Sequence, residues 1–302
     1  MVELPNYVDV NNLIDDLRVL CWEAADILLH YSQRIKDVNY KDSLIKNNDH
    51  INPVTLADLE VNDLILKKMH IKYPYIAWKY ISEENAKIDP KICDINSDWI
   101  WVLDPLDGTK DFIQGTGEYA MHFALNYKNK PFLGFVLIPE MDELWISNGV
   151  YAWGEKRDRT IIKPKLDVKE SLSNMTLVKS KNHSNKTLID LIEKINFKKV
   201  TTMGSIGCKI ASIVRGESDI YISLSLPGKT SPKDWDFAAP EIVLKTAGGS
   251  ITNLDNEELI YGQDNFEQGG IIVASNYKEM HGDICSKIKE TILKNNFYPS
   301  NY

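Results

Sequence analysis

The stretch WVLDPLDGTKDF, residues 101–112, places two aspartates three positions apart at the end of an apolar run. Asp104 precedes a proline, and Asp107 precedes Gly108 and Thr109. Two carboxylates this close repel each other, so in a partly buried pocket the pKa of one would rise unless a cation lay between them. The stretch therefore predicts a metal site, although Pro, Asp and Gly are also the usual residues of a plain β-turn.

Carboxylates next to residues that begin or end an element occur at three further places. Asp58 follows PVTLA, Glu83 and Glu84 follow an apolar segment, and Asp236 opens a helix. Oxygen ligands without His or Cys suit a hard cation such as Mg²⁺. Each place also has a purely structural alternative: a capping box that ends at Asp58, a pair of solvated glutamates, and an N-cap at Asp236.

The pair Gly108 and Thr109 adds a second kind of chemistry. A glycine lets the backbone approach a ligand closely, and a helix that starts here can hold a phosphate with its free N–H groups. Thr109 then offers a hydroxyl close to metal-bound water, and Asp58 can accept the proton of that hydroxyl and orient it. Together these parts indicate metal-assisted hydrolysis of a phosphate ester by in-line displacement.

The composition fits a folded protein that acts on a small molecule. With 302 residues and 43% hydrophobic content, the chain can form one large domain or two smaller ones that share a core. A net charge of −8 without a basic stripe argues against nucleic-acid binding. The four cysteines are scattered, which predicts neither a zinc ribbon nor disulfides and fits a reducing cytoplasm. Acidic residues within residues 13–29 argue against a signal peptide or a membrane span.

Hydrophobic spacing predicts an α+β arrangement for the N-terminal half, residues 1–155, which carries most of the candidate metal ligands. Apolar residues at three- and four-residue steps predict a helix over residues 13–29, and a second helix begins at Thr55 and ends near residue 74. The polar segment 36–52 between them is expected to be a loop. Strands are expected at residues 99–103, 119–126 and 132–138.

The C-terminal half, residues 156–302, alternates strands and helices and is expected to be α/β, with Asp236 and the substrate pocket in it. A polar, basic segment at residues 153–173 predicts a hairpin or linker at the boundary. The predicted strands are residues 175–179, 220–224 and 271–274, and the predicted helices are residues 185–195, 205–214, 237–246 and 277–294.

Four motifs share their order and approximate spacing with one enzyme family. NPVTLAD, ISEEN, WVLDPLDGTKDF and WDFAAPEIVLKTAGG resemble the motifs of the Mg²⁺-dependent, lithium-sensitive phosphatases that include inositol monophosphatase and 3'(2'),5'-bisphosphate nucleotidase. The resemblance extends over nearly the whole chain. It implies an α/β protein with a layered αβαβα sandwich fold and the activity of a phosphoric monoester hydrolase.

The resemblance also implies roles for individual residues. Its metal-binding side chains correspond to Glu83, Asp104, Asp107 and Asp236, with the carbonyl oxygen of Leu106 as a further ligand, and together they would hold two or three Mg²⁺ ions. Thr109 and Asp58 correspond to the pair that positions the attacking water together with Glu83, while Gly108 and Thr109 offer backbone N–H groups to the phosphate. Lys46 lies where the family often carries a lysine on a metal-capping loop.

Three stretches resemble the bisphosphate nucleotidase branch: DGTKDF, VKSKNH and GSIGCK. By that resemblance the adenosine and the 5'-phosphate would be contacted by Ser180, His183, Gly204, Ser205 and Lys209. A lysine and a helix start can bind a second phosphate, and a histidine can stack on a base or donate a hydrogen bond to it. The plain alternatives are a polar loop residue for His183 and a solvated helix charge for Lys209.

The sequence therefore predicts a cytoplasmic Mg²⁺-dependent phosphatase, monomeric or homodimeric, without nucleic-acid or membrane partners. Its expected substrate is 3'-phosphoadenosine 5'-phosphate, which would give AMP and phosphate, with 3'-phosphoadenylyl sulfate as a second substrate. One alternative is an inositol monophosphatase or a sugar phosphatase similar to fructose-1,6-bisphosphatase, which would use the same catalytic residues. Another is a catalytically silent module that binds nucleotide or metal.

Overall fold

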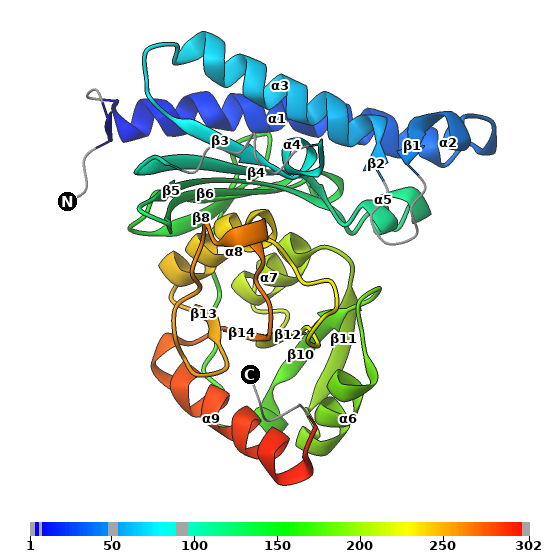
Figure 1. Cartoon of the computed structure of the whole chain (residues 1–302), viewed down its shortest axis with the longest axis vertical. Coiled ribbons are helices and arrows are strands. Elements are labelled where there is room, and N and C mark those ends of the chain that lie inside the picture. The colour runs from blue at the N-terminus through cyan, green and yellow to red at the C-terminus, as the bar shows by residue number, and fades with distance from the viewer. Residues whose placement is uncertain (1–3, 6–7, 48–53, 89–95, 298–302) are drawn as a thin grey trace.

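The chain folds into five alternating layers of helices and sheets. The computed structural model describes residues 4–5, 8–47, 54–88 and 96–297. Figure 1 shows helices α1 (Val10–Ile35) and α3 (Leu56–Lys72) on one face of a seven-stranded sheet, and α7 (Ile206–Val214) and α8 (Asp234–Ala247) on its other face. A five-stranded sheet follows, and α6 (Lys186–Ile195) and α9 (Lys278–Asn295) cover its far side. The αβαβα sandwich expected from the sequence is thus confirmed.

The seven-stranded sheet has its strands in sequence order. Its first pair is parallel and its other pairs are antiparallel. The strands are β3 (Lys79–Ser82), β4 (Trp99–Asp107), β5 (Ala120–Tyr127), β6 (Lys130–Ile138), β7 (Glu143–Ser147), β8 (Ala152–Glu155) and β9 (Ile161–Ile162). Because helices cover both faces, β4 is buried along almost its whole length, which explains its unbroken apolar run.

The five-stranded sheet has the order β11-β10-β12-β14-β13, with β14 antiparallel to both of its neighbours. The strands are β10 (Thr176–Ser180), β11 (Lys199–Met203), β12 (Ile220–Leu224), β13 (Ser250–Asn253) and β14 (Ile271–Ser275). The last strand of the larger sheet, β9, ends at Ile162, seven residues after the predicted domain boundary at residues 155 and 156. That boundary stays a prediction.

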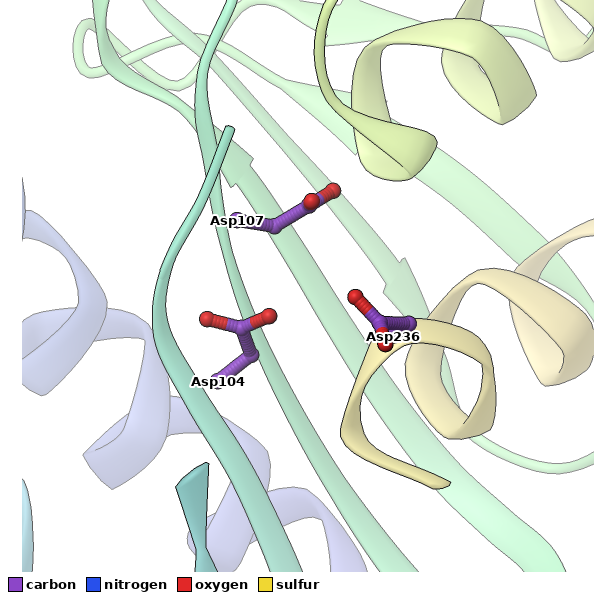
Figure 2. A group of neighbouring side chains, drawn as sticks. All are labelled: Asp104, Asp107 and Asp236. Carbon is purple, nitrogen blue, oxygen red and sulfur yellow. The ribbon is translucent and has the colours of Figure 1, made fainter. Parts of the chain in front are cut away.

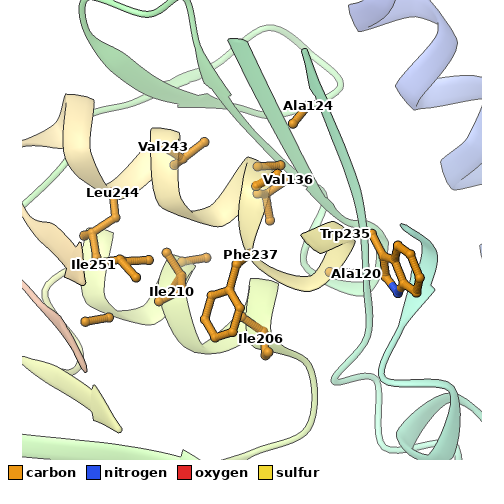
Figure 3. Close-up of a cluster of buried hydrophobic side chains, with 14 of the residues drawn as sticks. Ala120, Ala124, Val136, Ile206, Ile210, Trp235, Phe237, Val243, Leu244 and Ile251 are labelled. Carbon is orange, nitrogen blue, oxygen red and sulfur yellow. The ribbon is translucent and has the colours of Figure 1, made fainter. Parts of the chain in front are cut away.

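The central helices α7 and α8 lie between the two sheets and form the core with them. Figure 3 shows Phe237 of α8 beside Ile206 of α7, and both side chains are buried. On the other side α8 lies directly on Gly134 of β6, where a Cβ atom would come within 2.4 Å of Ile242 and 3.0 Å of the Ala239 carbonyl oxygen. This packing fixes α8, and with it Asp236, close to the larger sheet.

The structure differs from the prediction for residues 36–52. A short helix, α2 (Val38–Leu44), continues into β1 (Ile45–Asn47), which pairs with β2 (Val54–Thr55). Among the side chains described for residues 41–46 only Leu44 is buried, and it packs in the same core cluster as α1. The apolar residues of this mostly polar segment are too few to give a sustained helical period. Lys46 lies in β1 with an exposed side chain, and residues 48–53 of its motif lie outside the described residues.

Other elements were missed because they are short or exposed. The exposed edge strand β11 has no buried residue, and β3, β7, β8 and β13 have only four or five residues each. Helix α8 begins at Asp234, three residues before the predicted start, so Pro240 lies inside it and cannot donate an N–H to the carbonyl of Asp236. None of the described helices combines the length and the apolar composition that crossing a membrane requires.

Candidate active site

A β-bulge in β4 brings the two aspartates of the opening motif to the same place. Along β4 the register against β5 shifts between Asp104 and Asp107, which face His122 and Ala120 respectively. In a regular strand, residues three apart point to opposite faces, and one extra residue reverses this. Pro105 fits the bulge because it has no N–H to contribute to the ladder. The two carboxylates can therefore meet at the carboxyl end of β4.

Asp236 joins them from the first turn of α8. Figure 2 shows the three aspartates with their carboxylates directed toward a common point, and ligand oxygens of all three lie within 4.8 Å of one another. Burial raises the pKa of both Asp104 and Asp236 well above the usual range, and repulsion from neighbouring carboxylates raises it further. A cation at this point would offset that repulsion, so the donor set fits a hard metal ion such as Mg²⁺.

Glu83 lies beside this cluster because β3 runs parallel to β4 and ends at the same edge of the sheet. It is the first residue of α4 (Glu83–Ile88), and after burial the repulsion from its carboxylate is the largest cause that raises the pKa of Asp104. Lys87, one helical turn later, lies 3.0 Å from Glu83 and 2.8 Å from Glu84. Sequence reasoning missed Lys87, although its four-residue spacing from Glu83 is a recognisable helix signal.

The two carboxylate oxygens of Asp58 face two different residues, Thr55 and Thr109. Its Oδ2 accepts hydrogen bonds from the backbone N–H of Thr55 at 2.7 Å and from the Thr55 hydroxyl at 2.6 Å, so the capping box is present. Its Oδ1 lies 3.5 Å from the Thr109 hydroxyl. Burial, followed by repulsion from Glu84, raises the pKa of Asp58 to about 7. The structural and the functional interpretation of Asp58 are therefore compatible.

The turn after β4 is shaped by Gly108, which has a φ of +88°. A Cβ atom there would lie 3.0 Å from the Glu118 carbonyl oxygen and 3.2 Å from the Cβ atom of Ser205, so only glycine fits without strain. Helix α5 (Thr109–Gln114) starts at the next residue, which is the condition for its free N–H groups to hold a phosphate. The Thr109 hydroxyl donates to the Leu106 carbonyl oxygen at 3.0 Å, which places that carbonyl beside the aspartates.

A cavity of about 730 Å³ connects the acidic cluster with most of the predicted nucleotide residues. Its wall includes nearly all of the predicted site residues, namely Glu83, Asp104, Leu106, Asp107, Gly108, Thr109, Ser180, His183, Gly204, Lys209 and Asp236. The structure also adds wall residues that sequence reasoning did not single out, among them Lys110, Asn182 and Phe266. Lys110 and Asn182 lie within the quoted motifs, whereas no sequence signal marked Phe266.

Lys209 and Ser205 occupy places that the sequence did not reveal. Lys209 is only 1% exposed, so it is not a solvated helix charge. Its ammonium donates to the Gly204 carbonyl oxygen at 2.6 Å and lies 5.2 Å from the centre of the Tyr221 ring, and burial lowers its pKa. Ser205 is fully buried, and its hydroxyl donates to Asp107 at 2.6 Å instead of facing the cavity.

Comparison with known proteins agrees with this architecture. Five layers, with carboxylates gathered at the end of a buried strand beside a large cavity, are the construction of a metal-dependent phosphatase. The chain belongs to the inositol monophosphatase family, whose model matches residues 10–293. The resemblance found in the motifs is thus confirmed, and the chain is a phosphatase of this family.

Relatives with a curated function include 3'(2'),5'-bisphosphate nucleotidases named CysQ. The protein from Buchnera aphidicola is 32% identical over 263 residues, covering 85% of this chain and 92% of that protein. The protein from Salmonella typhimurium is 26% identical over 82% of this chain and 94% of its own length. Among solved structures, the inositol monophosphatase from Anabaena has a TM-score of 0.70 at 20% identity, covering 97% of this chain and 99% of that one, which shows the shared fold.

Adding Mg²⁺ is expected to raise the melting temperature by several degrees, because an ion that binds only the folded state stabilises it by mass action. Thermal unfolding with and without millimolar MgCl₂, at matched ionic strength, measures the shift. Asp104→Asn should abolish most of it, whereas Asp98→Asn, at a side chain that is 65% exposed, should leave it unchanged. An unshifted wild-type melting curve would argue against a metal site at these aspartates.

Proposed function

We propose that this phosphatase is a Mg²⁺-dependent 3'(2'),5'-bisphosphate nucleotidase. It removes the 3'-phosphate of 3'-phosphoadenosine 5'-phosphate to give AMP and phosphate, and 3'-phosphoadenylyl sulfate is a second substrate. The observation that carries the proposal is the continuous cavity of about 730 Å³, which has the acidic cluster on one wall and the buried ammonium of Lys209 on another. A substrate with two separate anionic groups matches the ions that the acidic cluster would hold together with the ammonium of Lys209.

The acidic side chains lie where they would bind metal ions at the scissile phosphate. Glu83, Asp104, Asp107 and Asp236, with the Leu106 carbonyl oxygen, would hold the ions. When bound, Mg²⁺ supplies positive charge that polarises the phosphoryl group and lowers the pKa of a nearby water. We propose that the site binds two or three Mg²⁺ ions.

Thr109 and Asp58 orient the attacking water in this proposal. The Thr109 hydroxyl donates to the Leu106 carbonyl oxygen in this structure, and it would donate to Asp58 Oδ1, 3.5 Å away, when that carbonyl binds an ion. The hydroxyl oxygen would then accept a hydrogen from the attacking water, so that a lone pair of the water is directed at phosphorus. The buried position of Asp58 excludes competing solvent from this hydrogen bond. Backbone N–H groups at Gly108 and Thr109 bind the phosphate oxygens.

The second anionic group and the base are assigned to the part of the cavity wall that Lys209 and His183 supply. Lys209 is already buried and therefore loses little solvation when it pairs with a phosphate. Ser180, His183 and Gly204 line the same cavity, and the His183 backbone N–H donates to the Ser180 hydroxyl at 3.2 Å. His183 would stack on the base or hydrogen-bond to it. Ser205 acts indirectly, through its bond to Asp107.

The proposed function predicts a strong preference among three phosphate esters. Phosphate release with Mg²⁺ should be fastest for 3'-phosphoadenosine 5'-phosphate and much slower for inositol 1-phosphate and fructose 1,6-bisphosphate, and we expect lithium to inhibit it. A preference for either of the latter would keep the metal site and discard the nucleotide pocket. Inactivity toward all three substrates would favour a silent binding module.

A further inference from the structure

Asp111 is a buried carboxylate that lies next to the proposed catalytic residues, and its side-chain partners lie outside the acidic cluster. It follows Thr109 by two positions on α5, and no part of it is exposed. A buried carboxylate is costly to maintain unless several donors satisfy it. Its partners therefore indicate what the residue contributes.

The partners of Asp111 come from the other half of the chain as well as from its own. Its Oδ2 accepts a hydrogen bond of 2.6 Å from the side-chain amide of Asn182. Its Oδ1 accepts one of 3.1 Å from the Thr116 hydroxyl and lies 3.5 Å from the ammonium of Lys181. The same ammonium lies 3.4 Å from Glu118. We call Asp111, Glu118, Lys181 and Asn182 the clasp.

The clasp also holds the backbone at Gly204. A Cβ atom at Gly204 would lie 2.3 Å from the Asp111 carboxylate and 2.7 Å from the Glu118 carbonyl oxygen, so Asp111 packs directly on this glycine. The Gly204 N–H donates to the Glu118 carboxylate at 3.2 Å. The carbonyl of Gly204 is the acceptor of Lys209. One carboxylate thus touches two separate segments of the cavity wall.

We propose that Asp111 is a positioning residue that sets specificity for the nucleoside end of the substrate. It holds the segment of residues 181–185, which carries His183, and the Gly204 backbone at a fixed place relative to the acidic cluster. This inference rests on the proposed nucleotidase function. The charged hydrogen bond to Asn182 gives the strongest part of the connection, since the more exposed contacts of Lys181 are worth little.

The test compares two substrates in Asp111→Ala. For 3'-phosphoadenosine 5'-phosphate, KM should rise about tenfold or more while kcat stays within about threefold, because a charged hydrogen bond that orders the pocket is lost. For inositol 1-phosphate, which has no nucleoside for residues 181–185 to contact, kcat/KM should stay within about twofold of the wild type. Asp283→Ala, at an exposed aspartate of α9, is the matched control and should change neither.

Asn182→Ala removes the same hydrogen bond by changing its donor instead of Asp111, so it leaves no buried gap on α5. It should reproduce the rise in KM, and the double variant should be no worse than either single one, because both remove one interaction. Equal losses of kcat on both substrates would show that Asp111 acts on the acidic cluster and would overturn the inference. An unchanged KM for the nucleotide in both single variants would also overturn it.

Amide hydrogen exchange separates the positioning role from the substrate assignment. In Asp111→Ala, residues 181–185 should exchange faster than in the wild type, while the buried helix α8 should stay protected. If the wild-type protein does not prefer the nucleotide, the proposed function fails and the specificity part of the inference fails with it. Unchanged exchange of residues 181–185 would instead refute the positioning role alone.

Discussion

Asp107→Asn is expected to lower kcat by about 100-fold or more without unfolding the protein, because it removes a proposed metal ligand where charge develops in the reaction. The substitution should remove the negative charge and keep the hydrogen bonds that Asp107 accepts. Asp107 Oδ2 accepts from the Ser205 hydroxyl at 2.6 Å and from the N–H groups of Ile206 and Gly207 at 2.5 and 3.1 Å. An asparagine can keep its carbonyl oxygen toward these donors, which preserves the start of α7, and present an NH₂ group where the ion needs an oxygen.

The measurement is kcat at saturating substrate over a range of Mg²⁺ concentrations, together with the far-ultraviolet circular dichroism melting curve. The exposed Asp98→Asn serves as the control for loss of one negative charge. Turnover close to that of the wild type in Asp107→Asn would remove Asp107 from the proposed metal site. A melting temperature that fell sharply would mean that the amide does not replace the carboxylate at α7.

Lys209→Met should lower kcat/KM for 3'-phosphoadenosine 5'-phosphate by about 10- to 100-fold, as expected for the loss of a charged hydrogen bond to phosphate. Methionine is similar in length and keeps the buried volume filled. The fold should be as stable as before, since the substitution removes a charge whose burial is unfavourable. Turnover of inositol 1-phosphate, which has no second phosphate, should change less than about threefold.

Steady-state kinetics on both substrates decide the question, and Lys287→Met provides the control because Lys287 is an exposed lysine of α9 that does not line the cavity. A parallel loss on both substrates would place Lys209 in the support of the acidic cluster and not at a second phosphate. No loss on either substrate would contradict the proposed nucleotide pocket.

Local sequence carried much of the active-site prediction, since residues next to each other in a motif stay close after folding. The apolar run before Asp104 is a strand buried on both faces, and Gly108 occupies a backbone conformation that favours glycine. The layer order, by contrast, came from the family resemblance, because short strands such as β7 and β13 show no decisive period.

Contacts between distant segments could not be predicted. Ser205 binds Asp107 from 98 positions away, and Asn182 binds Asp111 from 71 positions away. A residue type at a motif position indicates which bonds a side chain can make, but only the packing of the layers decides which partner it meets. This is why Ser205 was expected to contact substrate and Asp111 was overlooked.

The glycine beneath α8 has a further consequence for how this enzyme can vary. Gly134 lies on β6, outside the cavity wall, yet it determines how closely α8 approaches the sheet that carries Asp104. Any side chain there would push the helix outward and carry Asp236 away from its two partners. The spacing of the three carboxylates therefore depends on a residue outside the cavity, and a survey confined to cavity-lining positions would overlook it.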